Sequence, residues 1–151
     1  MTPASRTGMA SPEDTIRALA DAVIPSPPDD ETAGASDVAA ERFVVHYLTF
    51  LAPELPGLLA AALDGVAAAR AGVPFEEGLF ESLDHEQRLA ALRGLGEHES
   101  SDLRQLADLA VALITAAFYG EWTGQDENGA MTRRPVGWDL TGYAGPADAI
   151  P

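Results

Sequence analysis

The chain has 151 residues, a formal net charge of −15 and no cysteine. Without cysteine, disulfides, thiolate metal sites and cysteine nucleophiles are excluded. The basic residues are nine arginines and no lysine, a balance that argues against nucleic acid or an anionic membrane surface as a partner. The acidity indicates a well-solvated surface or, alternatively, electrostatic steering toward a basic partner. This length predicts a single domain with a real hydrophobic core.

The first predicted element is an amphipathic helix with a clear start. Ser11 followed by Pro12 and two acidic residues is typical of a helix N-terminus. Apolar residues at helical spacing then continue to Pro25, where the helix should stop. A loop rich in Pro, Asp and Gly follows over 25–35, and a second helix is predicted from Ser36.

The second and third predicted helices are both strongly apolar. We expect one face of the second helix to carry Ala40, Phe43, Val44, Tyr47, Leu48 and Leu51. Pro53 and Pro56 mark the break after it. The third helix begins near Leu55 and ends at Gly72, because glycine is the residue that most often follows a helix C-terminus.

Two more helices complete the predicted body. The fourth follows a short break and is capped by Ser82 or Asp84. The fifth and most hydrophobic is capped by Ser100 or Ser101 and ends at Gly120. Its apolar stripe is predicted to contain Leu103, Leu106, Ala110, Leu113, Ile114, Ala117 and Phe118.

The predicted fold class is therefore all-α, a compact array of about five helices with an extended, irregular, aromatic C-terminal arm. Wide apolar stripes on several helices require that they pack on one another. We expect a flexible N-terminus over 1–10, a helical domain over 11–121, and an arm over 122–151 that packs on the body or on a partner.

The C-terminal arm keeps aromatic side chains although it has no helical period. Disordered tails are normally poor in aromatic residues, so these rings should either fold back on the body or dock on another protein. Arg133 and Arg134 are adjacent in this arm. They are either solvated arginines that offset local acidic residues or anchors of a protein interface. The predicted partner-interface residues are Tyr119, Trp122, Arg133, Arg134, Trp138 and Tyr143.

Catalytic, cofactor-binding and metal-binding residues are not predicted in this chain. His85 and His98 each lie between acidic residues, but solvated charge clusters explain both better than a general base or a metal ligand does. His46 is expected at the flank of the second helix or partly buried. The acidic run 29–31 lacks the spacing of a calcium loop.

Membrane insertion is not expected. The longest apolar stretch, Leu106 to Tyr119, is interrupted by Asp108 and fits a buried helix better than a membrane span. The N-terminus has neither an apolar segment nor an arginine pair of the kind that export signals carry. A cytoplasmic location is therefore expected, with export alongside a partner left open.

Several motifs together resemble a known family. The early helix ends in ALADAVIPSPPDDETAGA, a Phe-x-x-Leu element precedes Arg88, and the chain closes with Phe-Tyr-Gly and then Gly-Trp-x-x-x-Gly-Tyr-x-Gly-Pro. From about Glu13 to Pro146 this pattern is similar to the gluconate 2-dehydrogenase subunit 3 family, the small subunit of flavin-dependent sugar and alcohol dehydrogenases.

The resemblance implies a non-catalytic subunit that binds and stabilises or matures a large oxidoreductase of the glucose-methanol-choline type. That partner would hold the FAD and carry out the hydride chemistry on a sugar or alcohol, while this chain would bind no cofactor. In the sugar dehydrogenases of this family the small subunit also supplies a twin-arginine export signal. This sequence departs from the family there, because no such signal precedes Ser11.

Two other function classes stay open at this stage. One is a stand-alone helical ligand-binding protein or small enzyme, which predicts a bound molecule or an activity in the isolated chain. The other is a self-assembling structural protein whose arm exchanges between identical subunits.

Overall fold

The computed structural model describes residues 11–28, 33–120, 138 and 141–144, and among these residues it is all-α. The predicted array of about five helices is confirmed, and one additional short helix is present. The elements are α1 (Pro12–Val23), a 3-10 turn η1 (Ser36–Val38), α2 (Ala40–Leu51), α3 (Leu55–Ala71), α4 (Leu79–Ser82), α5 (His85–Gly96) and α6 (Ser101–Gly120). The predicted N-terminal segment and most of the C-terminal arm lie outside the described residues.

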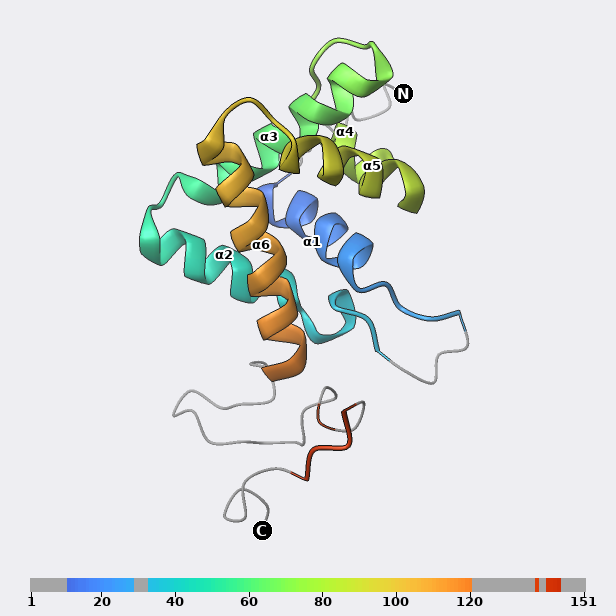
Figure 1. Cartoon of the computed structure of the whole chain (residues 1–151), viewed down its shortest axis with the longest axis vertical. Coiled ribbons are helices and arrows are strands. Elements are labelled where there is room, and N and C mark those ends of the chain that lie inside the picture. Colours follow the sequence, from blue (N-terminus) through green and yellow to red (C-terminus); the bar gives the residue numbers. More distant parts are fainter. Residues whose placement is uncertain (1–10, 29–32, 121–137, 139–140, 145–151) are drawn as a thin grey trace, which may run out of the picture.

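Helix α1 is the centre of the fold. The Ser11 hydroxyl accepts a hydrogen bond from the Asp14 N–H at 3.3 Å, and Pro12 occupies the first helical position, as predicted. The buried side of α1 includes Ile16 and Leu19, which are fully shielded from solvent. Helix α1 contacts every other described α-helix, and Figure 1 shows the remaining helices arranged around it.

The second helix begins later than the sequence indicates. Ser36 starts a 3-10 turn, and α2 begins only at Ala40, after Ala39 has taken a left-handed backbone conformation with φ of 53°. Just before this turn, Ala35 N–H donates to the Ile24 carbonyl at 2.8 Å, which draws the end of the 25–35 loop back against α1. The loop is thus closed at its base, and the reversal at Ala39 redirects the chain into α2.

A buried carboxylate joins α3 to the segment that follows it. Asp64 on α3 is 3% exposed and accepts the N–H of Gly78 at 3.0 Å and of Phe80 at 2.9 Å. These bonds hold the start of α4, a short helix not anticipated from the sequence, and place Phe80 in the core. The predicted stop of α3 is confirmed, since Gly72 has φ of 66° and follows its last residue.

The two C-terminal helices begin at side-chain caps. Asp84 is the residue that caps α5, and with Gln87 it forms a reciprocal capping box. Ser100 accepts the N–H of Leu103 at the start of α6. The buried face of α6 consists of Leu106, Ala107, Ala110, Leu113, Ile114, Ala117 and Phe118.

Helix α6 is apolar enough to be compared with a membrane span. Its length and composition make it a candidate membrane span, but the core helix of a soluble protein meets the same criteria. Helices α2 and α3 meet the same criterion only as a pair, across a bend of 118°. In the described fold α6 packs against α2 and α5, and its apolar stripe forms part of the core.

Candidate protein interface

The two most exposed large apolar side chains of the described helices, Phe50 and Leu51, lie at the end of α2. Phe50 is 82% exposed, Leu51 49% and Tyr47 39%, and Leu58 is exposed on the first turns of α3. We call Tyr47, Phe50, Leu51 and Leu58 the α2 face. Tyr47, Phe50 and Leu51 lie within about one turn of α2, and an exposed apolar patch on a folded domain often marks a contact with another molecule.

This exposure corrects the prediction for the second helix. Tyr47 and Leu51 were expected on a buried face, but the residues that α2 buries are Ala40, Glu41, Val44 and Leu48. The body buries Val44 and Leu48 and partly covers Phe43 and Val45, while Tyr47, Phe50 and Leu51 remain exposed. A helix that is apolar around most of its circumference is typically covered on more than one side.

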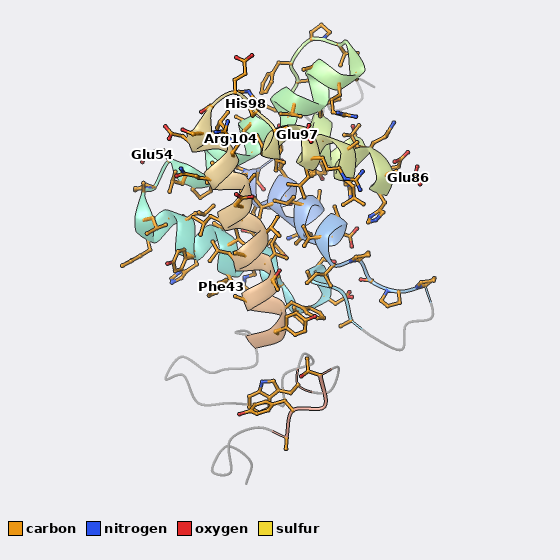
Figure 2. The ribbon with its side chains drawn as sticks, viewed as in Figure 1. Phe43, Glu54, Glu86, Glu97, His98 and Arg104 are labelled. Atoms are coloured by element: carbon orange, nitrogen blue, oxygen red, sulfur yellow. The ribbon has the colours of Figure 1, made fainter. Side chains whose placement is uncertain are left out.

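The α2 face borders a surface hollow. A depression of about 530 Å³ lies beside Phe50 and is also lined by Val45, Thr49, Arg42 and His46 of α2 and by Glu13 of α1. At the core side of α2, the ring of half-buried Phe43 lies 6.2 Å from that of Tyr47 (Figure 2 labels Phe43). The surface therefore offers both a projecting aromatic ring and an adjacent depression.

Ion pairs fix α2 on α1 beneath this surface. Arg17 donates through Nε to Glu41 Oε1 at 3.2 Å and also lies 3.3 Å from an oxygen of Asp14. Glu41 is almost fully buried, and the structure assigns no hydrogen-bond partner to its Oε2 among the described residues. The hydrogen bond to Glu41 raises the pKa of Arg17, and the contact holds the two helices in register.

Two aromatic residues of the arm, Trp138 and Tyr143, are among the described residues and lie close together. Gly142 has φ of 71°, and the N–H of Tyr143 donates to the carbonyl of Trp138 at 2.9 Å. A 6→1 bond that closes on a left-handed glycine is the Schellman pattern, which is commonly accompanied by a contact between the two flanking apolar residues. Here those residues are Trp138 and Tyr143, whose rings pack edge to face with centroids 5.2 Å apart.

The other predicted interface residues divide into one that the structure describes and three that it does not. Tyr119 is exposed on the last turn of α6, with its ring edge to face against Phe118 at 5.2 Å. Trp122, Arg133 and Arg134 lie outside the described residues. The structure therefore brings Trp138 and Tyr143 together and leaves the wider arm interface as a prediction.

The histidines occupy separate places on the fold. His85 and His46 are exposed on α5 and α2, and His98 is half-buried in the loop before α6. Within the described ranges, no group of three or more His, Asp or Glu side chains is placed to hold a metal ion. The ring of His98 is held by the backbone, since its Nδ1 accepts the Ser100 N–H at 3.0 Å.

Sequence reasoning concentrated on the arm and missed Phe50 and Leu58 as candidate contact residues. A usable signal was present, because Phe43, Tyr47, Phe50 and Leu51 together cover more of the circumference of α2 than one neighbouring helix can bury. No family model, curated protein or solved structure matches the chain.

Proposed function

We propose that this chain is a non-catalytic accessory subunit that binds and stabilises a large FAD-dependent oxidoreductase of the glucose-methanol-choline type. The partner would act on a sugar or alcohol and would hold the flavin. The motifs that resemble the gluconate 2-dehydrogenase subunit 3 family support the class of partner.

The α2 face is the observation that carries this proposal. Aromatic and large aliphatic side chains at the centre of an interface provide most of its binding energy, and Phe50 projects almost fully into solvent. Arg17 and Glu41 hold the helix that presents it, so little ordering is needed on binding. The aromatic pair Trp138–Tyr143 supplies a second preformed contact element.

The first experiment is affinity purification of the tagged chain, under mild conditions, with its genomic flavoprotein partner identified by mass spectrometry. We expect a stoichiometric complex with flavin absorbance and dehydrogenase activity. A colourless, monomeric chain without a stoichiometric companion would contradict the proposal. A homo-oligomer of the chain alone would instead support the self-assembly hypothesis.

The second experiment tests the α2 face with Phe50→Ser in the purified complex. Burial of an exposed phenylalanine contributes about 1.5–3 kcal/mol, so the Kd should rise by about 10- to 150-fold. The stability of the isolated chain should change by less than about 0.5 kcal/mol, because Phe50 makes little contact within the fold. Unchanged affinity would place the partner elsewhere on the surface.

Phe75→Ser is the matched control. Phe75 is also exposed, at 56%, but it lies in the segment between α3 and α4 rather than on the α2 face. A chain truncated after Gly120 tests the arm separately, and we expect it to lose the partner while keeping its helical circular dichroism. Full binding by the truncated chain would eliminate the arm as a contact and leave the α2 face.

A further inference from the structure

A second hollow, whose lining shares no residue with the α2 face, lies where α3, α5 and α6 meet. It has a volume of about 590 Å³, within the range of small-molecule sites. Its apolar lining includes Val66 of α3 and Leu103 of α6, and its polar lining consists of Arg70 and His98. The proposed accessory function uses none of these residues.

Glycines on two of the helices shape this hollow. A Cβ added to Gly65 would meet no atom within 4 Å, which shows that open space lies directly above the α3 backbone. A Cβ on Gly94 of α5 would lie 3.0 Å from Cγ1 of Val66, so α3 and α5 approach closely at that point. The hollow is thus bounded by a tight helix crossing and left open above Gly65.

Arg70 supplies a cationic group at the edge of the hollow. No carboxylate lies within ion-pair distance of Arg70 in the part of the chain that the structure describes. Its Nη1 lies 3.8 Å from the position that a Gly94 Cβ would take. In a chain of net charge −15, an arginine without an acidic neighbour is available to a ligand.

His98 is a second polar residue in the lining of the same hollow. Its Nδ1 accepts the backbone N–H of Ser100, so the neutral ring carries its proton on Nε2. Arg104 donates to the carbonyls of His98 and Glu99, which holds this loop at the start of α6. Figure 2 shows His98 and Arg104 together at that end of α6.

We propose that this hollow binds a short aliphatic carboxylate. The guanidinium of Arg70 and the Nε2–H of His98 would donate hydrogen bonds to the carboxylate oxygens. Arg suits this role because its planar guanidinium presents several N–H donors that match the geometry of a carboxylate. The alkyl chain would lie against Val66 and Leu103, over Gly65. This inference goes beyond the accessory function and does not depend on it.

The test is a titration of the isolated, full-length, isotope-labelled chain with hexanoate, followed by amide NMR shifts. We expect saturable shifts at Gly65, Gly94 and Leu103, and weaker binding of hexan-1-ol, which lacks the charge. Arg70→Gln should raise the Kd for hexanoate by about tenfold or more, the effect of losing a charge-assisted hydrogen bond. Gly65→Leu, which fills the open space, should abolish the shifts.

Arg42→Gln is the matched control, because it removes the same charge from α2, away from the hollow. The proposal is overturned if hexanoate produces no saturable shifts at the hollow, if hexanol binds as well as hexanoate, or if both arginine variants weaken binding equally. Circular dichroism verifies that each variant is folded, and Arg70→Gln alone decides the matter if Gly65→Leu does not fold. No partner protein is present, so the outcome is independent of whether the flavoprotein complex exists.

Discussion

Replacing Asp64 with alanine should destabilise the fold substantially, because the carboxylate accepts two backbone N–H groups from the segment before α5. The N–H of Phe80 is buried and would lose its acceptor without access to water. The N–H of Gly78 is only partly buried, so water can replace the carboxylate there more easily. The chief effect should therefore be the loss of the anchor at the start of α4.

The expected loss of unfolding free energy is about 2–4 kcal/mol. An unsatisfied buried N–H costs about 1–3 kcal/mol, and a half-buried one about 1 kcal/mol. Part of this loss is offset, because the variant no longer has the desolvation penalty of a buried carboxylate. For a chain of this length, the loss corresponds to a decrease in Tm of about 4–16 °C.

Urea unfolding followed by circular dichroism at 222 nm measures the change. Asp64→Asn should lie between the wild type and Asp64→Ala, because the amide keeps one acceptor oxygen. Asp108→Ala is the control, since it removes the same charge from an exposed position on α6. If Asp64→Ala unfolds at the same urea concentration as Asp108→Ala, the two hydrogen bonds do not hold α4 in place and the reasoning is wrong.

Two further predictions concern the loop between α1 and α2. Gly34→Ala should lower the free energy of unfolding by about 2 kcal/mol or more, because the added Cβ would lie 2.4 Å from the backbone nitrogen of Ser26. Gly57→Ala is the control and should be neutral or stabilising, because its Cβ would meet no neighbouring atom. Thermal unfolding of the two variants distinguishes these outcomes. Hydrogen bonds from the Ser26 hydroxyl and the Gly34 N–H lower the pKa of Asp37 below its ordinary value of 3.8. The stability that Asp37 contributes is therefore complete above that ordinary value. It is lost as the pH falls through the lower pKa of the folded state. We therefore expect the wild type and Asp37→Asn to differ in unfolding free energy by less than about 1 kcal/mol, because Asp37 is exposed. This difference should be constant above about pH 4 and shrink below it. A difference that persists at lower pH would refute this assignment.

The features that the sequence predicted well are those decided by neighbouring residues. Ser11 with Pro12, Asp84, and Gly72 act on backbone groups one to three residues away, so their effect on helix ends is legible without the fold.

The features that were missed depend on contacts between distant segments. Asp64 holds α4 through residues fourteen and sixteen positions away, which no local pattern shows. The left-handed turn at Ala39 is not marked by glycine or asparagine, the residues that usually signal it. More than one face of α2 is apolar enough to be buried. Packing against the other helices determines which face is covered, and Phe50 and Leu51 remain exposed.

The central position of α1 has a consequence for the order in which the protein is made. This helix leaves the ribosome before every element that it contacts, and the last of those, α6, ends at Gly120. Its apolar stripe, Ile16 and Leu19 included, can therefore be fully covered only after α6 is made, and partly covered apolar segments of nascent chains are prone to aggregate or to recruit chaperones. Completion of α6, rather than of any earlier helix, should be the event after which the nascent chain first becomes resistant to protease.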